Sequence, residues 1–164
     1  MLIAYGLLLT AVGMDLRSMR ISNRLIIISL TIALVRRFIC EGILGVFTGM
    51  ILICIPVVLL YLLFLAGALG AGDIKLFSVV GGFVSLKELL WCMVFAFVFA
   101  AVFALGKMLY FGTFFSSMRN VWNYILKLGS GIKEPYVPMS ASLGRMHFSI
   151  AILLGLMATN IFIS

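Results

Sequence analysis

The chain has 164 residues, of which 65% are hydrophobic and 10% are charged, and its formal net charge is +7. A soluble domain of this size has too little interior for so much apolar surface, so the composition excludes an ordinary soluble protein and predicts a single membrane domain, residues 1–164. Basic loops that orient membrane helices and contact the headgroups of membrane lipid account for the positive charge, and we therefore expect no nucleic-acid partner.

The apolar runs predict an all-α fold, a bundle of about six transmembrane helices, because roughly 20 apolar residues span a bilayer. The first and fourth runs are short, and a re-entrant helix is an alternative for the fourth. The polar stretch 107–145 interleaves aromatic and basic residues, which indicates a cytoplasmic amphipathic helix in the membrane surface. The predicted membrane segments are 2–15, 25–40, 43–66, 74–86, 89–106 and 146–163.

Basic residues follow the first apolar run, and none precedes it. No small-residue cleavage site follows either, so we expect a retained first helix rather than a signal peptide. Six alternating spans then place nine of the twelve Lys and Arg residues on the cytoplasmic side, which predicts a multi-pass protein of the cytoplasmic membrane. The three basic residues on the outer side, two of them adjacent exceptions to this bias, are Arg36, Arg37 and Lys87.

The cysteines are widely spaced and lie in or beside apolar runs, at Cys40, Cys54 and Cys92. No CxxC pair occurs, so the pattern favours buried thiols that fill helix packing over a metal site. We expect neither a metal nor a cofactor.

Only five acidic residues are present, and they divide into two groups. Glu41, Glu88 and Glu134 fall in predicted turns or loops, where a solvated or interfacial charge is the simplest interpretation. Asp15 and Asp73 instead adjoin apolar helices, where an ionised carboxylate is costly and usually functional. The predicted topology places both aspartates at the cytoplasmic face.

Glycines precede the second aspartate in the sequence Gly70-Ala71-Gly72-Asp73. They permit unusual backbone angles and the close approach of a neighbouring helix or an extended peptide. The alternative is a flexible turn in which Asp73 caps the helix that follows.

The Gly70–Asp73 segment matches the GxGD signature of membrane aspartyl proteases, and the following Ile-Lys-Leu resembles the version found in type IV prepilin peptidases. The segment from Asp15 to Asn23, with sequence DLRSMRISN, resembles the aspartate, arginines and Ile-Pro-Asn of the same family. The resemblance covers residues 2–106. It implies that Asp15 and Asp73 are the catalytic carboxylates and that four other motif residues support them, namely Gly70, Gly72, Lys75 and Asn23.

The chain departs from the family pattern at three places. Ser22 stands where proline is usual, and residues 146–148 lack a proline–aromatic pair, so His147 receives no catalytic role. An amino-terminal extension with paired cysteines, which accompanies N-methyltransferase activity in the long forms, is not expected, and the chain resembles the short, protease-only form.

The resemblance implies an aspartic endopeptidase that removes the basic leader from type IV prepilins or pseudopilins at the cytoplasmic membrane face. Two close carboxylates would share a proton and activate a water molecule. The sequence leaves open which one is protonated, and whether Lys75 contacts substrate, stabilises the pair or anchors the loop.

Alternatives are an archaeal preflagellin peptidase and, from another class, a non-enzymatic membrane subunit or small transporter. A transporter favours polar residues near mid-membrane, whereas these acids are predicted at one face. Proteases of the presenilin kind would use the same acids but carry a Pro-Ala-Leu motif that is absent here.

Overall fold

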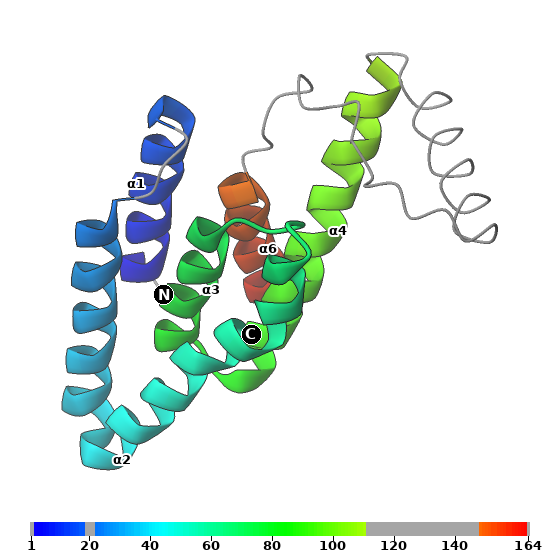
Figure 1. The fold of residues 1–164 in the computed structure, drawn as a ribbon. Coiled ribbons are helices and arrows are strands. Elements are labelled where there is room, and N and C mark those ends of the chain that lie inside the picture. The colour runs from blue at the N-terminus through cyan, green and yellow to red at the C-terminus, as the bar shows by residue number, and fades with distance from the viewer. Residues whose placement is uncertain (1, 19–21, 111–147, 164) are drawn as a thin grey trace, which may run out of the picture. The chain divides into compact units, whose positions relative to one another are not determined.

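Residues 2–18, 22–110 and 148–163 are described by a computed structural model, and the regular structure in these ranges is entirely helical. The prediction of an all-α fold is confirmed. Figure 1 shows the helices, which are α1 (Leu2–Ser18), α2 (Asn23–Leu65), α3 (Ala71–Phe83), α4 (Leu86–Tyr110) and α6 (Phe148–Phe162).

Two of the described helices are long and apolar enough to cross a membrane, namely α2 and the part of α4 from Leu86 to Lys107. Helices α1, α3 and α6 have 17, 13 and 15 residues, fewer than the roughly 20 that span a bilayer. The prediction of six spanning helices is therefore not confirmed. Many large apolar side chains on α2 are exposed, as a lipid-facing surface requires, including Ile39, Leu44 and Leu62.

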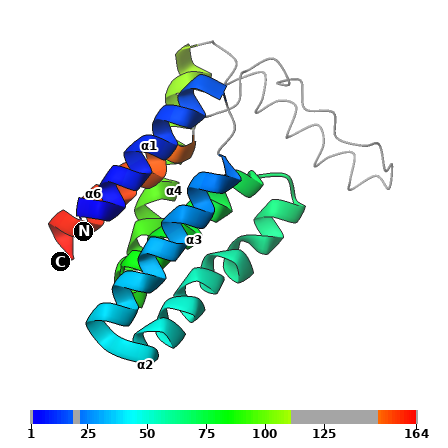
Figure 2. The ribbon, with the colours of Figure 1, turned by 90° about the vertical axis from the view of Figure 1, so that its left-hand side faces the viewer.

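Helix α2 is interrupted at Gly42, where φ is +68° and ψ is −154°. Residues with a side chain rarely adopt a positive φ, so glycine is the residue that allows the chain to reverse here. Figure 2 shows this corner between the two arms of α2. The arms, 23–41 and 43–65, correspond closely to the predicted segments 25–40 and 43–66.

Helix α3 packs against both arms of α2, and two small residues make this possible. A Cβ on Gly81 would collide with the carbonyl oxygen of Leu52, and a Cβ on Gly82 would lie 2.8 Å from that of Ala33. Small residues at helix interfaces allow backbones to approach closely inside a membrane. The packing therefore fixes α3, which carries Asp73 at its start.

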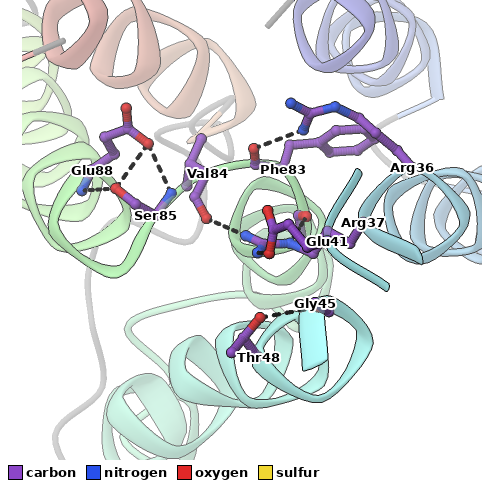
Figure 3. A network of polar contacts seen from close by, with 10 residues as sticks. Arg36, Arg37, Glu41, Gly45, Thr48, Phe83, Val84, Ser85 and Glu88 are labelled. Atoms are coloured by element: carbon purple, nitrogen blue, oxygen red, sulfur yellow. Dashed lines mark hydrogen bonds and ion pairs between the residues drawn. The ribbon is translucent and has the colours of Figure 1, made fainter. Parts of the chain in front are cut away.

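The C-terminal end of α3 receives hydrogen bonds from two arginines of α2, as Figure 3 shows. Arg37 donates to the carbonyl oxygens of Gly82 at 2.8 Å and Val84 at 2.6 Å, and Arg36 donates to that of Phe83 at 3.2 Å. The last carbonyls of a helix have no partner within it, and basic side chains satisfy them well. Helix capping thus gives a local reason for the two arginines that depart from the predicted positive-inside distribution.

Two of the three glutamates have structural partners. Ser85 donates its backbone N–H and its hydroxyl to Glu88, at 2.8 and 2.9 Å, which is a capping box at the start of α4. Glu41 is exposed and forms an ion pair with Arg37 at 3.4 Å. Glu134 lies outside the described residues.

The chain up to Phe99 and α6 belong to one compact unit, which contains the whole candidate site. At its centre, Phe77 of α3 lies 6.3 Å from Phe97 of α4 and 6.0 Å from Phe148 of α6, measured between ring centres. Phe77 is fully buried. The prediction of a single domain over residues 1–164 stays a prediction.

Two of the differences from the predicted boundaries change where named residues lie. Helix α3 begins at Ala71 rather than at position 74, so Asp73 lies within its first turn. Helix α4 extends to Tyr110, so Lys107 belongs to it and not to the polar stretch 107–145. From position 111 that stretch, with its predicted amphipathic helix, lies outside the described residues, as does His147.

Candidate active site

Asp15 lies near the C-terminal end of α1 and is half-buried. It accepts a hydrogen bond from the hydroxyl of Ser149, with 2.6 Å between Oγ and Oδ2. Ser149 belongs to the first turn of α6 and has no exposed surface. The end of α1 and the start of α6 are therefore joined at the carboxylate.

Asp73 lies in the first turn of α3, where the unpaired N–H groups of a helix favour negative charge. The backbone N–H of Gly70 donates to its carboxylate, at 3.2 Å from Oδ2, and the backbone N–H of Asp73 donates to the carbonyl of Gly70 at 3.1 Å. A Cβ on Gly70 would lie 3.1 Å from the same Oδ2. The glycine thus provides both a donor and the space for the carboxylate.

The two aspartates interact electrostatically. The pKa of Asp73 is raised to about 6: burial raises it most, the hydrogen bond from Gly70 lowers it, and the charge of Asp15 also raises it. A like charge has this effect only at short range, because solvent screens more distant groups. Figure 1 shows the end of α1 and the starts of α3 and α6 at the same end of the helices. The charge of Asp15 thus acts on the predicted partner Asp73, and we call the two residues the aspartate pair.

Two of the predicted supporting residues contact each other. Lys75, on α3, donates to the side-chain oxygen of Asn23 at the start of α2, with 2.8 Å between Nζ and Oδ1. Both are exposed or half-exposed. This hydrogen bond links the start of α2 to the start of α3. In the sequence, Lys75 follows Asp73 closely and Asn23 follows Asp15.

The model of the type IV leader peptidase family matches residues 2–105. The chain belongs to the type IV leader peptidase family. It is accordingly a peptidase, and the family together with its apolar helices makes it a membrane protein. No curated protein and no solved structure matches the chain.

The part matched to the leader peptidases contains every site residue that the sequence predicts. Both aspartates, Gly70, Gly72, Lys75 and Asn23 lie within residues 2–105. Gly72 is half-buried in the first turn of α3, and the direct contact with the carboxylate is made by Gly70. Among the described residues of this leader peptidase, no group of three or more His, Cys, Asp or Glu could hold a metal ion.

Sequence reasoning missed Ser149, which lies beyond the part matched to the leader peptidases. Its contact joins residues that are 134 positions apart, so no local sequence pattern predicts it. The available signal is its position, because Ser149 is a polar residue in the first turn of a mostly apolar helix. A polar side chain in such a helix is a candidate for function.

Proposed function

We propose that the chain is an aspartic endopeptidase and that Asp15 and Asp73 are its catalytic carboxylates. The observation that carries this proposal is that the charge of Asp15 acts on the pKa of Asp73, with the end of α1 and the start of α3 at the same end of the helices. Family membership supports the peptidase activity, and the electrostatic effect supports two carboxyl groups that act as a pair.

The proposed reaction needs one ionised and one protonated carboxyl group. The ionised group takes a proton from a bound water, whose hydroxide adds to the scissile carbonyl carbon while the protonated group gives its proton to the carbonyl oxygen. The intermediate then collapses. The first carboxyl passes its proton to the amine nitrogen, the C–N bond breaks, and a hydroxyl of the intermediate returns a proton to the second. Both carboxyl groups end as they began.

The proposed substrate is a type IV prepilin or pseudopilin, cut between its basic leader and its hydrophobic helix. The family name supports a leader as the part removed. An apolar exposed surface on α2 supports a substrate that shares the same lipid environment. A preflagellin-type substrate is the alternative within the same chemistry.

The decisive experiment replaces each aspartate separately in cells that also express a prepilin. Asp15→Asn and Asp73→Asn should each abolish cleavage while the protein remains in the membrane. Glu41→Gln serves as the control, because Glu41 is exposed and pairs with Arg37 away from the aspartate pair, and it should cleave normally. Near-normal cleavage by either aspartate variant would remove that residue from the reaction. If a preflagellin is cleaved and a prepilin is not, the substrate assignment changes while the chemistry stands.

We also propose that the aspartate pair lies at the cytoplasmic face, as the basic residues predict. Single cysteines at Ala71 and Glu41, in a chain lacking the three native ones, test this with an impermeant thiol reagent. The cysteine at Ala71 should be protected in intact cells and react once the inner face is opened, and the one at Glu41 should react from outside. The reverse pattern would place the aspartate pair at the outer face.

A further inference from the structure

The contact between Ser149 and Asp15 has the geometry of a strong hydrogen bond. Its length, 2.6 Å between Oγ and Oδ2, falls in the range of about 2.5–2.7 Å for a hydroxyl that donates to an ionised carboxylate. The serine hydroxyl is the donor and the carboxylate oxygen of Asp15 is the acceptor. The side chain of Ser149 has no exposed surface, so water does not compete directly with this donor.

Packing on all sides holds Ser149 in place. Its neighbour Phe148 contacts Phe77 and Phe97, with ring centres 6.0 and 5.7 Å apart. Further along α6, a Cβ on Gly155 would lie 2.7 Å from a backbone carbonyl oxygen of α4. The hydroxyl of Tyr5, on α1, donates to a carbonyl of α6 at 3.3 Å. Helix α6 is therefore fixed against the helix that carries Asp15, and the serine hydroxyl has little freedom to turn away.

Several groups near Asp15 can be named among the described residues. Helix α6 contains no titratable side chain between Phe148 and Phe162. On α3, Asp73 is the group that interacts with Asp15 electrostatically, and the ammonium of Lys75 binds Asn23. On α1 itself, Arg17 follows two residues later and is exposed. Ser149 is thus a neutral donor aimed at one member of the aspartate pair.

We propose that Ser149 is a positioning residue of the aspartate pair: by donating to Asp15 it holds this carboxylate in place as a hydrogen-bond acceptor, which makes Asp15 the general base and Asp73 the general acid. This proposal rests on the proposed aspartic peptidase function and assigns the two roles that the sequence leaves open. The raised pKa of Asp73, about 6, is consistent with it, because burial favours the protonated form there.

With Asp15 as the general base and Asp73 as the general acid, each proton transfer of the reaction can be assigned to one residue. Asp15 takes the proton of the attacking water, and Asp73 gives its proton to the carbonyl oxygen. On collapse, Asp15 passes its proton to the leaving amine and Asp73 recovers one from the intermediate. Ser149 stays bonded to Asp15, keeps its own proton and does not touch the reacting atoms.

The test uses the purified full-length protein in detergent and a prepilin substrate, with rates expressed per mole of folded enzyme. Ser149→Ala should lower kcat about ten-fold with little change in KM, because a hydrogen bond to a charged group is lost. The acid limb of the pH–kcat profile should move up by about one pH unit, because the aspartate pair then loses a hydrogen bond that favours its charged form. Ser149→Cys keeps the shape of serine with a somewhat larger γ atom that donates weakly, and it should behave like Ser149→Ala.

The matched control is Ser29→Ala, because Ser29 is equally buried and its hydroxyl bonds a carbonyl of its own helix at 2.7 Å. It should leave both kcat and the pH profile unchanged. The inference is overturned if Ser149→Ala matches this control, or if its kcat falls while the acid limb stays in place, which would indicate a structural role. Activity in Asp15→Asn or Asp73→Asn would instead refute the proposed function itself, so the two failures are distinguishable.

Discussion

The ammonium of Lys75 lies 2.8 Å from the side-chain oxygen of Asn23, so a lysine two residues after Asp73 binds the start of another helix. The resemblance to prepilin peptidases leaves the role of Lys75 open between substrate contact, support of the carboxylates and membrane anchoring. The contact with Asn23 favours support, because it links the helices on either side of the site.

A double-mutant cycle tests this role. If the contact is a link between helices, Lys75→Met and Asn23→Leu should each lower activity by less than about ten-fold, and the double variant should be no worse than either, since an exposed hydrogen bond contributes about 1 kcal/mol. The measurement is kcat/KM on a prepilin substrate. A much larger loss for Lys75→Met alone would indicate that the lysine contacts substrate instead.

Gly70 is the glycine that contacts the carboxylate of Asp73. Its φ of −80° and ψ of 150° suit any residue, so Gly70→Ala introduces no backbone strain. The new methyl group would lie 3.1 Å from Oδ2 of Asp73 and displace it by a few tenths of an ångström. We expect reduced kcat at normal abundance in the membrane. Gly6→Ala is the control, because nothing lies within 4 Å of a Cβ there, and equal activity in the two variants would contradict the argument.

Because the pKa of Asp73 is raised in the folded protein, the stability of the protein depends on pH. This pKa is about 6 in the folded protein against an ordinary value of 3.8, so folding favours the protonated form. The contribution is full below pH 3.8 and is lost as pH rises through 6. Relative to Asp73→Asn, the native protein should therefore lose thermal stability between pH 4 and pH 7. Tm measured in detergent at both pH values checks this, and a difference in Tm that does not change with pH would contradict it.

Arg37 is 8% exposed and binds two carbonyl oxygens at the end of α3. Arg37→Met should therefore destabilise the protein by about 2–4 kcal/mol, because buried carbonyl groups lose their donor. Arg36→Met, which removes a single contact from a half-buried side chain, should cost less. Thermal unfolding in detergent measures both. Equal small losses would show that the hydrogen bonds to α3 are replaced by water.

Hydropathy was enough to predict the helices, and the glycine at position 42 even separates the two predicted segments that form α2. The start of α3 was predicted three residues late, because the glycines around Ala71 read as a turn although they begin the helix. The local motifs identified both aspartates. The partners of Arg37 and of Asp15 could not be predicted, because these contacts depend on how helices pack and join residues that are 45 and 134 positions apart.

The most direct test of the central claim is a cross-linking measurement between positions 15 and 73. Asp15→Cys and Asp73→Cys would be combined in a chain lacking Cys40, Cys54 and Cys92, with a protease site introduced between α1 and α3. A short bifunctional thiol reagent should then hold the two fragments together after cleavage. Asp15→Cys combined with Glu88→Cys is the control, since Glu88 follows the opposite end of α3, and this pair should separate. Efficient linking of 15 to 73 but not to 88 is the result that we predict. Fragments that separate in both cases would contradict the claim that Asp15 and Asp73 lie close together.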